Sequence, residues 1–282
     1  MSIVELKRWN VAIGGDGPLA VIAGLNVLED LDLALETGRV LKTACADLGL
    51  PYVFKASFDK ANRSSIRSYR GPGLKEGLAQ LAEVKTRLSV PICTDLHEID
   101  QAGPVAAVAD LVQIPAFLNR QTDLVVAAAK ATAAAGGLLH VKKSQHQAPW
   151  DVRNIISKAR EAAPDLSIVL CERGTAFGYN NLVVDMLAIG EMHKLGVPVS
   201  IDATHAVQLP GADPRTAGAS TGGRREGVPV LAKAAVAAGA DAVFLEFHPD
   251  PDRALCDGPS ALPLDVAAEL LATLKRVREA VS

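Results

Sequence analysis

Aromatic residues and excess positive charge are both scarce in this chain of 282 residues. Phe, Trp and Tyr make up 4% of it, and 29 basic residues against 32 acidic ones give a formal net charge of -3. Nucleic-acid binding needs a basic surface for phosphates, and single-strand binding also needs aromatic platforms for bases. The composition therefore argues against a nucleic-acid partner.

Long apolar runs are also missing. No stretch of about 18 uninterrupted apolar residues occurs, which is roughly the length that a membrane-spanning helix needs. Met1–Lys7 lacks the basic-then-apolar order of a signal peptide. We therefore expect a cytoplasmic protein without a membrane partner.

The four cysteines form neither a CxxC pair nor a spacing typical of zinc sites. Three of them lie within or beside apolar runs; the four are Cys45, Cys93, Cys171 and Cys256. Scattered cysteines in a cytoplasmic protein are ordinarily reduced. We therefore expect free thiols and no structural metal.

From Ala20 onward, short β-branched apolar runs alternate with amphipathic stretches rich in Ala and Leu. This alternation is typical of parallel βα units. Eight strands are predicted, at 20–24, 52–57, 90–95, 111–116, 138–143, 167–172, 198–203 and 242–247. Eight units predict the α/β class and a (β/α)8 TIM barrel, formed as one domain by residues 1–282.

Two segments fall outside these units. The segment before Ala20 predicts a short N-terminal hairpin with its turn at Gly14–Pro18, placed where it would plug the bottom of the barrel. Residues 209–224 are rich in Gly and Pro and predict a long loop between strand 7 and helix 7. Loops of that length often act as lids.

Helix-capping residues support the same division of the chain. Asp30 is a predicted N-cap for a helix over 31–47 that stops before Gly49. Asp265 is a predicted N-cap for the last helix, which ends near Val281.

Polar residues occupy the carboxyl ends of nearly all predicted strands or the loops that follow. They are Asn26, Lys55, Lys60, Asp95, His97, Gln113, Lys142, Lys143, Arg173, His205, Glu246 and His248. A single lysine after a strand is ordinarily solvated, but this many polar strand ends would meet at one mouth of a barrel. The pattern predicts an active site there.

The charges at this mouth indicate the kind of ligand. Five basic side chains are expected around the mouth, and Arg224 is a candidate for a sixth. The five are Lys55, Lys60, Arg63, Lys142 and Arg173. Ammonium and guanidinium groups bind phosphate and carboxylate, so a small substrate with both groups, such as phosphoenolpyruvate, fits. Gly71–Gly73 lacks the lysine and hydroxyl of a phosphate-binding P-loop, which disfavours nucleotides.

Longer motifs resemble one enzyme family over about residues 20 to 275. The matching segments are Phe54–Ser65, Ser68–Gly73, Gln113–Leu118, Arg120–Leu124, Phe177–Tyr179, Asn181–Met186, Asp202–Ala206, His248–Pro251 and Cys256–Pro263. Together they resemble the 3-deoxy-D-manno-octulosonate 8-phosphate synthases. The resemblance implies condensation of phosphoenolpyruvate, D-arabinose 5-phosphate and water to give 3-deoxy-D-manno-octulosonate 8-phosphate and inorganic phosphate, for lipopolysaccharide synthesis.

The resemblance also implies roles for the substrate-binding residues. The phosphate of phosphoenolpyruvate would lie on Lys142 and Arg173, and its carboxylate or neighbouring oxygens on Lys55, Ser57, Lys60 and Gln113. The pentose phosphate would lie on Asn62, Arg63 and Ser64, in a clamp completed by another subunit of a homotetramer. Asp95 would lie near the aldehyde, and Pro115, Ala116 and Phe117 would form the pocket wall. A capped helix start is the structural alternative for Asn62–Ser65.

A last cluster resembles the family's metal position and would act on the attacking water or the aldehyde. Its members are Asn26, His205, Glu246 and Asp257. The metal-requiring branch of the family has cysteine where this chain has Asn26, and a neutral amide is a poor ligand for a transition metal. We therefore expect no metal and no cofactor. Cys256–Gly258 resembles the metal-independent branch, whereas Ala148–Asp151 resembles the metal-requiring one.

Three other functions remain open. A related heptulosonate synthase would use erythrose 4-phosphate, but its Lys-Pro-Arg-Thr motif is replaced here by Lys60–Arg63. A Schiff-base aldolase would use Lys142 as nucleophile. A barrel that binds phosphosugars without turnover is the third, because fold does not determine function. One departure from the family pattern, Ser144–His146 in the fifth loop, leaves open a titratable group near the phosphates or a different sugar preference.

Overall fold

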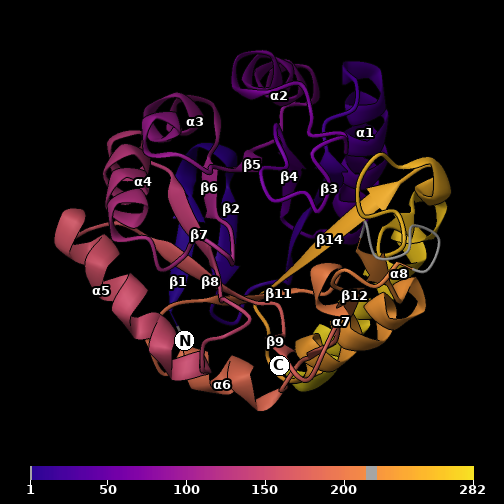
Figure 1. Ribbon diagram of the computed structural model, residues 1–282. Helices are drawn as coiled ribbons and strands as arrows, with labels where there is room; N and C mark the ends of the chain where they lie inside the picture. The colour runs from indigo at the N-terminus through magenta and orange to yellow at the C-terminus, as the bar shows by residue number, and fades with distance from the viewer. Residues whose placement is uncertain (1, 214–220) are drawn as a thin grey trace.

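The computed structural model describes residues 2–213 and 221–282. Eight parallel strands form a closed barrel, because each pairs with the next along the chain and the last also pairs with the first (Figure 1). They are β3 (Ala20–Val27), β4 (Tyr52–Ser57), β5 (Ile92–Asp95), β6 (Leu111–Ile114), β7 (Leu138–Lys142), β8 (Ile168–Glu172), β11 (Val199–Asp202) and β14 (Ala242–His248). The predicted TIM barrel and its eight strands are confirmed.

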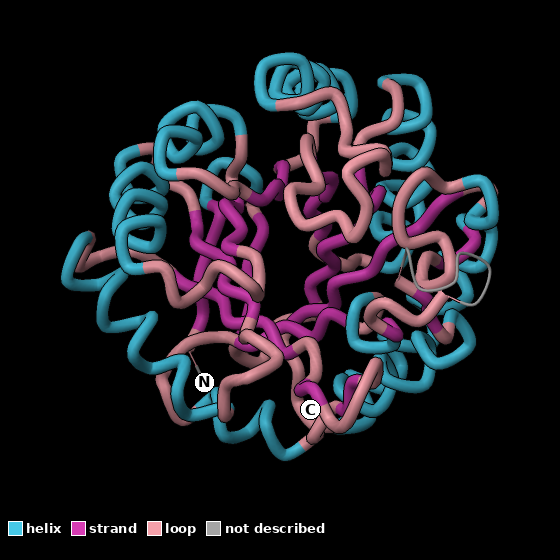
Figure 2. Tube along the Cα trace, in the orientation of Figure 1, coloured by secondary structure: helices cyan, strands magenta, loops and turns pink. Residues whose placement is uncertain are grey.

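Helices form a ring around the barrel (Figure 2). In the described part of the chain they are α1 (Leu31–Leu48), α2 (Leu74–Leu88), α3 (Ala102–Val108), α4 (Thr122–Ala134), α5 (Arg153–Ala162), α6 (Leu187–His193), α7 (Val228–Ala237) and α8 (Ala267–Val281). Their buried apolar faces pack on the outward side chains of the strands to make the main core. Within the described ranges, no helix is both long and apolar enough to cross a membrane.

The capping predictions had different outcomes. Asp30 accepts a hydrogen bond from the Leu33 amide at 2.8 Å, and Gly49 ends α1 in the left-handed conformation, as predicted. The Asp265 prediction was wrong. A 3₁₀ turn over Leu264–Val266 precedes α8, and no side chain caps the first turn of that helix. The structural alternative for Asn62–Ser65, a capped helix start, is not found, since α2 begins only at Leu74.

The N-terminal hairpin is present, but its turn lies elsewhere. Strands β1 (Ile3–Leu6) and β2 (Val11–Gly14) are antiparallel and are joined through the 3₁₀ turn Lys7–Trp9. Gly14–Pro18 instead links β2 to β3, so the predicted turn position was wrong. The backbone of Gly14 is close enough to the Ser2 carbonyl that a Cβ would lie 2.3 Å from that oxygen, which only glycine allows.

The hairpin closes the amino-terminal end of the barrel. Its side chains Leu6, Val11 and Ile13 belong to a small buried apolar cluster with inward residues of the strands, among them Ile22 and Phe244. The Trp9 indole also donates to the Asp110 carboxylate at 2.7 Å. The predicted plug is thus confirmed, and the barrel opens only at its carboxyl end within the described residues.

Period-two alternation along the strands explains why that open end is polar. Residues two apart on a strand face the same side, so each strand has one inward row. On β14 this row passes from Ala242 through Phe244 to Glu246, and on β7 it passes from Leu138 through His140 to Lys142. The inward rows therefore change from apolar at the hairpin to charged at the mouth.

Short strands border the mouth. The pairs are β9 (Thr175–Ala176) with β10 (Leu182–Val183), β12 (Gln208–Leu209) with β13 (Gly222–Gly223), and β15 (Leu262–Pro263) with β14. The predicted lid over 209–224 includes residues 214–220, which lie outside the described residues. Its two flanks pair with each other through β12 and β13.

Candidate active site

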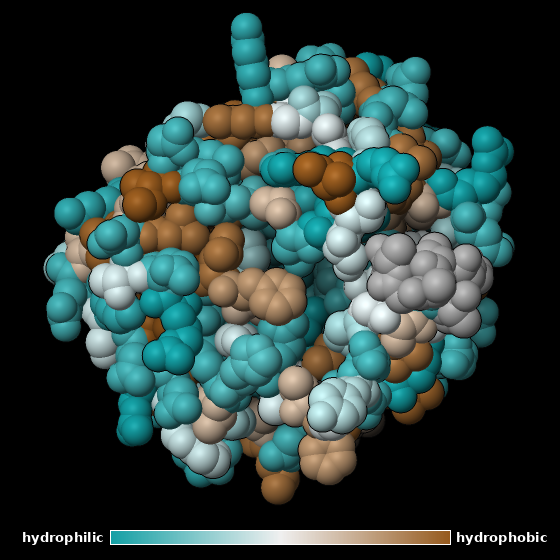
Figure 3. All heavy atoms as spheres, viewed as in Figure 1, coloured by the Kyte–Doolittle hydropathy of each residue, from teal (hydrophilic) through white to brown (hydrophobic). Residues whose placement is uncertain are grey.

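A cavity of about 780 Å³ lies at the carboxyl end of the barrel. Figure 3 shows a hollow near the centre of this face, bordered mostly by hydrophilic residues. Most predicted site residues line it: Lys55, Lys60, Asn62, Arg63, Ser64, Asp95, Gln113, Pro115, Ala116, Phe117, Lys142, Arg173, His205 and Asp257. Asn26, Ser57 and Glu246 do not line it and are buried. The structure thus brings together residues from all parts of the chain.

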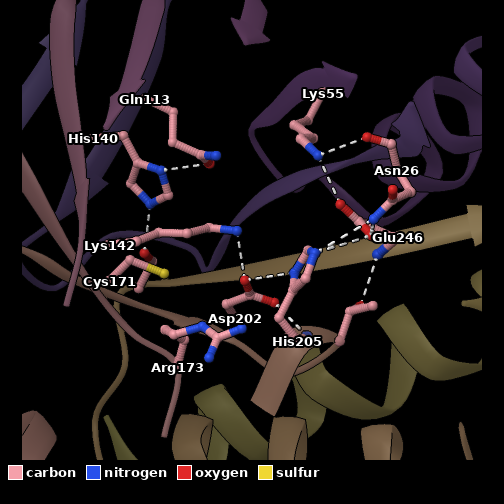
Figure 4. Close-up of polar contacts among 12 residues, drawn as sticks. Asn26, Lys55, Gln113, His140, Lys142, Cys171, Arg173, Asp202, His205 and Glu246 are labelled. Carbon is pink, nitrogen blue, oxygen red and sulfur yellow. Dashed lines mark hydrogen bonds and ion pairs between the residues drawn. The ribbon is translucent and has the colours of Figure 1, made fainter. Parts of the chain in front are cut away.

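Lys55 on β4 and Glu246 on β14 form a buried ion pair. The Lys55 ammonium lies 2.7 Å from the Glu246 carboxylate and also donates to the Asn26 carbonyl oxygen at 3.1 Å (Figure 4). Burial alone would raise the pKa of Glu246, but His205 and Lys55 lower that pKa to about 2. Glu246 is therefore a carboxylate at neutral pH.

Lys142, Asp202 and His205 form a second buried set. The Asp202 carboxylate lies 2.6 Å from the Lys142 ammonium and 2.8 Å from Nδ1 of His205 (Figure 4). Burial opposes ionisation of Asp202, but His205 and Lys142 hold its pKa well below the ordinary value. Asp202 also accepts from the His205 backbone amide at 2.8 Å, which fixes the loop after β11. This residue was missed by sequence reasoning, although it is an inward residue at a strand end.

Three cations at the cavity keep donors that no described side chain neutralises. Lys60 makes no side-chain hydrogen bond or ion pair with any described residue, and burial together with Lys55 lowers its pKa. Arg173 donates from Nη2 to Gln208 at 3.1 Å, while its buried Nη1 has no partner among the residues described. Arg63 donates from Nη1 to the Cys256 sulfur, and its Nε is likewise unpartnered in the described chain. Buried cations with free donors indicate an anionic ligand.

Two further residues of the cavity complete its hydrogen bonds: His97, which was predicted to lie at the mouth but was given no role, and Gln208, which was not predicted. His97 lies 3.1 Å from Asp95, whose pKa is held well below its usual value by His97 and nearby lysines against the opposing effect of burial. Gln208 donates to Asp257 at 3.0 Å while accepting from Arg173. His97 follows a strand end two residues after Asp95, which is a detectable signal. Gln208 lies beyond a 3₁₀ turn, and no sequence pattern points to it.

The amide of Asn26 lies at the centre of the carboxylate cluster. Its Nδ2 donates to Glu246 and to Asp257, the latter at 3.1 Å, and lies 3.4 Å from Nε2 of His205. An amide N–H₂ group cannot ligate a cation. Here it donates hydrogen bonds to the carboxylates that a metal ion would otherwise bind. Among the described residues, no group of three or more His, Cys, Asp or Glu side chains is arranged to hold a metal ion. This donor set does not fit a transition metal.

Comparison with known proteins gives the family. The model of the DAHP synthetase I family matches residues 2–282. The chain belongs to the DAHP synthetase I family. It is 53% identical over 281 residues to the 2-dehydro-3-deoxyphosphooctonate aldolase of Desulfotalea psychrophila, covering 100% of this chain and 97% of that relative. Relatives with the same name in Shewanella frigidimarina and Marinobacter nauticus are 52% identical (99% of this chain, 95% of the relative) and 51% identical (100% and 97%).

In this member of the DAHP synthetase I family, the segment Ser144–His146 after β7, which departs from the family pattern, contributes to two separate hollows. Gln145 lines the cavity, and its buried Oε1 has no hydrogen-bond partner in the described part of the chain. Ser144 is buried. His146 is exposed and faces a separate hollow of about 420 Å³ beside Phe177 and Asp185. The imidazole of His146 therefore does not line the cationic cavity of its own chain.

The low pKa of Glu246 predicts a pH dependence of stability. Its folded value of about 2 lies below the ordinary 4.5, so the ionised side chain stabilises the fold above about pH 4.5. That contribution, on the order of 3 kcal/mol, should be lost as the pH falls from about 4.5 to 2. Urea unfolding of the wild type and of Glu246→Gln should therefore differ progressively less over this range. An unchanged difference would contradict the assignment.

Proposed function

We propose that this chain catalyses the condensation of phosphoenolpyruvate with D-arabinose 5-phosphate and water, giving 3-deoxy-D-manno-octulosonate 8-phosphate and inorganic phosphate. The observation that carries the proposal is that Lys60, Arg63 and Arg173, buried or half-buried around one cavity, each keep a donor without a partner among the described residues. Two anionic substrates would supply the missing negative charge. The shared name of the relatives favours this reaction over that of the heptulosonate synthases.

Phosphoenolpyruvate is proposed to bind at the deeper end of the cavity. Lys142 and Arg173 are buried there and would hold its phosphate. Lys55, Lys60 and Gln113 would hold the carboxylate or neighbouring oxygens. The proposed role of Ser57 has less support, because its buried hydroxyl does not line the cavity.

The pentose phosphate is proposed to bind nearer the rim. Asn62 and Ser64 are exposed and Arg63 is half-buried, so a phosphate there would remain open to a neighbouring molecule. The resemblance to relatives in which another subunit completes this clamp supports a cytoplasmic homotetramer as the working form. Asp95 would lie near the aldehyde. Pro115 and Ala116 would form the wall, with Phe117, which is 58% exposed, at the edge.

The chemistry requires one new carbon–carbon bond and one new carbon–oxygen bond. The C2–C3 electron pair of the enol attacks the aldehyde carbon, and the aldehyde oxygen takes up a proton. Water adds to C2 and gives up one proton; the new C2 hydroxyl then passes its proton to the departing phosphate as the bond between C2 and the phosphate oxygen breaks, which leaves a ketone and inorganic phosphate. His205, held by Asp202, faces Asn26, Glu246 and Asp257 and could move these protons. The cations would stabilise the departing phosphate.

Phosphate release tests the reaction. We expect release from phosphoenolpyruvate with arabinose 5-phosphate and background release with erythrose 4-phosphate. The reverse preference would assign the chain to the heptulosonate synthases, and no release with either would favour a binding barrel. A covalent adduct on Lys142 trapped by borohydride would support the Schiff-base aldolase instead.

We further propose that the reaction needs no metal, because the amide of Asn26 already satisfies the carboxylates of Glu246 and Asp257. Excess EDTA should therefore leave the rate of phosphate release unchanged. The variant Asn26→Cys would place a thiolate beside His205, Glu246 and Asp257, and its rate should become sensitive to EDTA. Loss of wild-type activity with EDTA, restored by a divalent cation, would overturn this proposal.

A further inference from the structure

A second buried ion pair lies beside the anion-binding residues at the ends of β7 and β8. The side chains of Lys143 and Glu172 are each 1% exposed, and the ammonium lies 3.5 Å from the carboxylate. Neither residue lines the cationic cavity, but each directly neighbours in sequence a residue that does, namely Lys142 or Arg173. A buried ion pair ordinarily gains little stability over apolar side chains, because both charges lose their water. Stability alone is therefore a weak explanation for this pair.

The Lys143 ammonium joins the segments that follow β7 and β8. Besides Glu172 it contacts two oxygens from each segment. They are the carbonyl oxygens of Ser144 (3.2 Å), Gln147 (3.4 Å) and Gly174 (3.2 Å) and the hydroxyl of Thr175 (3.1 Å). An ammonium group only donates, and its three hydrogens can serve oxygens of both segments. Lys143 therefore fastens one segment to the other.

Glu172 holds the backbone that carries the Arg173 side chain. Its Oε1 accepts from the backbone amide of Arg173 at 2.9 Å and from that of Gly174 at 2.6 Å. The carbonyl oxygen of Gly174 is the one that Lys143 binds. Gly174 has a φ of +89°, a conformation that favours glycine, so the chain turns sharply directly after Arg173. The direction of the Arg173 side chain therefore depends on the buried pair.

The segment after β7 is itself held by further hydrogen bonds, so it can serve as an anchor. The buried Asn119 side chain donates to the Lys142 carbonyl oxygen at 2.8 Å and to Oε1 of Gln147 at 2.7 Å. The carbonyl oxygen of Gln145 accepts from the Ala176 amide at 3.0 Å, which adds a second link between the two segments. The segment after β8 is thus fastened to a neighbour whose own position is fixed.

We propose that Lys143 and Glu172 are positioning residues: by joining the segments after β7 and β8, they hold the guanidinium of Arg173 where it can bind the phosphate of phosphoenolpyruvate. This inference rests on the proposed function in one respect, namely that Arg173 binds that phosphate. The pair does not line the cavity, so it acts through Arg173 and not on the substrate.

Binding of phosphoenolpyruvate tests the proposal without turnover. Lys143→Met should raise the Kd measured by isothermal titration calorimetry by about tenfold or more, because a small displacement of a binding group is costly. Trp9→Phe is the control, since it removes the hydrogen bond to Asp110 at the opposite end of the barrel and should leave the Kd unchanged. An unchanged Kd in Lys143→Met would overturn the proposal even if the enzyme is active. A raised Kd, in a protein that releases no phosphate with either sugar, would instead contradict the proposed function alone.

A second variant covers the case in which Lys143→Met does not fold, because that change leaves the Glu172 charge unpaired. Lys143→Met combined with Glu172→Gln leaves neither charge of the pair in the interior. The glutamine oxygen can still accept from the amides of Arg173 and Gly174, so this double variant removes only the link that Lys143 makes. Its Kd for phosphoenolpyruvate should also rise, and wild-type affinity in the folded double variant would contradict the proposed role of Lys143.

A mutant cycle tests whether the pair acts through Arg173. In an Arg173→Met background, Lys143→Met should change the Kd by less than about twofold, because no guanidinium remains to be positioned. Its effect on urea unfolding should be the same in both backgrounds. If Lys143→Met raised the Kd by the same factor with and without Arg173, Lys143 would be a packing residue and the proposal would fail.

Discussion

Replacing Arg173 with methionine is expected to lower kcat/KM for phosphoenolpyruvate by a factor of about 30 to 5,000. Arg173 is buried, and its Nη1 has no hydrogen-bond partner in the described residues, so the substrate's phosphate would complete its set of acceptors. Losing a charged donor in a buried site costs about 2 to 5 kcal/mol of binding. The measurement is phosphate release at limiting phosphoenolpyruvate and saturating pentose phosphate.

Two matched variants define the effect at Arg173. Arg173→Lys should recover only part of the loss, because an ammonium cannot reproduce the two-pronged contact of a guanidinium with phosphate. Arg160→Met removes an exposed arginine of α5 and should leave kcat/KM unchanged. Near-wild-type activity in Arg173→Met would place the phosphate of phosphoenolpyruvate elsewhere.

Replacing Lys55 with methionine is expected to lower the free energy of unfolding by about 3 to 5 kcal/mol. Lys55 and Glu246 are 1% and 0% exposed and lie 2.7 Å apart. The variant keeps the Glu246 charge in the interior but removes its ammonium partner, and an unpaired buried charge is costly. Urea unfolding followed by circular dichroism measures the loss.

The double variant Lys55→Met with Glu246→Gln should recover much of that loss, because neither charge then remains. The exposed pair between Arg87 and Glu83, at 4.0 Å with side chains 54% and 50% exposed, provides the control. Arg87→Met should cost less than about 0.5 kcal/mol. A similar small loss in Lys55→Met would mean that Glu246 can be neutralised without its lysine.

Much of the barrel could be predicted because local pattern and tertiary fold agree along its strands. Apolar runs mark the buried strands, and a polar residue near the end of a run, such as Lys142 on β7 or Glu246 on β14, lies at the carboxyl end of the barrel by the rule of parallel barrels. The long motif around Lys60 and Arg63 then indicated the ligand. These signals are local, so the sequence alone contains them.

The parts that could not be predicted depend on contacts between distant segments. Asp202 acquires its role by pairing with Lys142 and His205, which come from other parts of the barrel mouth. The Gly-rich segment at Gly14–Pro18 resembles a hairpin turn, but the close approach of Ser2 is what requires Gly14 there. Such requirements become visible only once the chain is folded.

The apolar hairpin that closes the amino-terminal end also has a kinetic consequence. With that end filled by Leu6, Val11 and Ile13, the cavity formed by the described residues opens only at the carboxyl end of the barrel, so reactants and products would enter and leave by the same opening. A sugar phosphate seated on Asn62 and Arg63 near the rim would stand between solvent and the deeper Arg173. If both substrates bind as proposed, the smaller reactant has to arrive before the sugar. Binding should follow a compulsory order, set by the architecture of the barrel rather than by affinity.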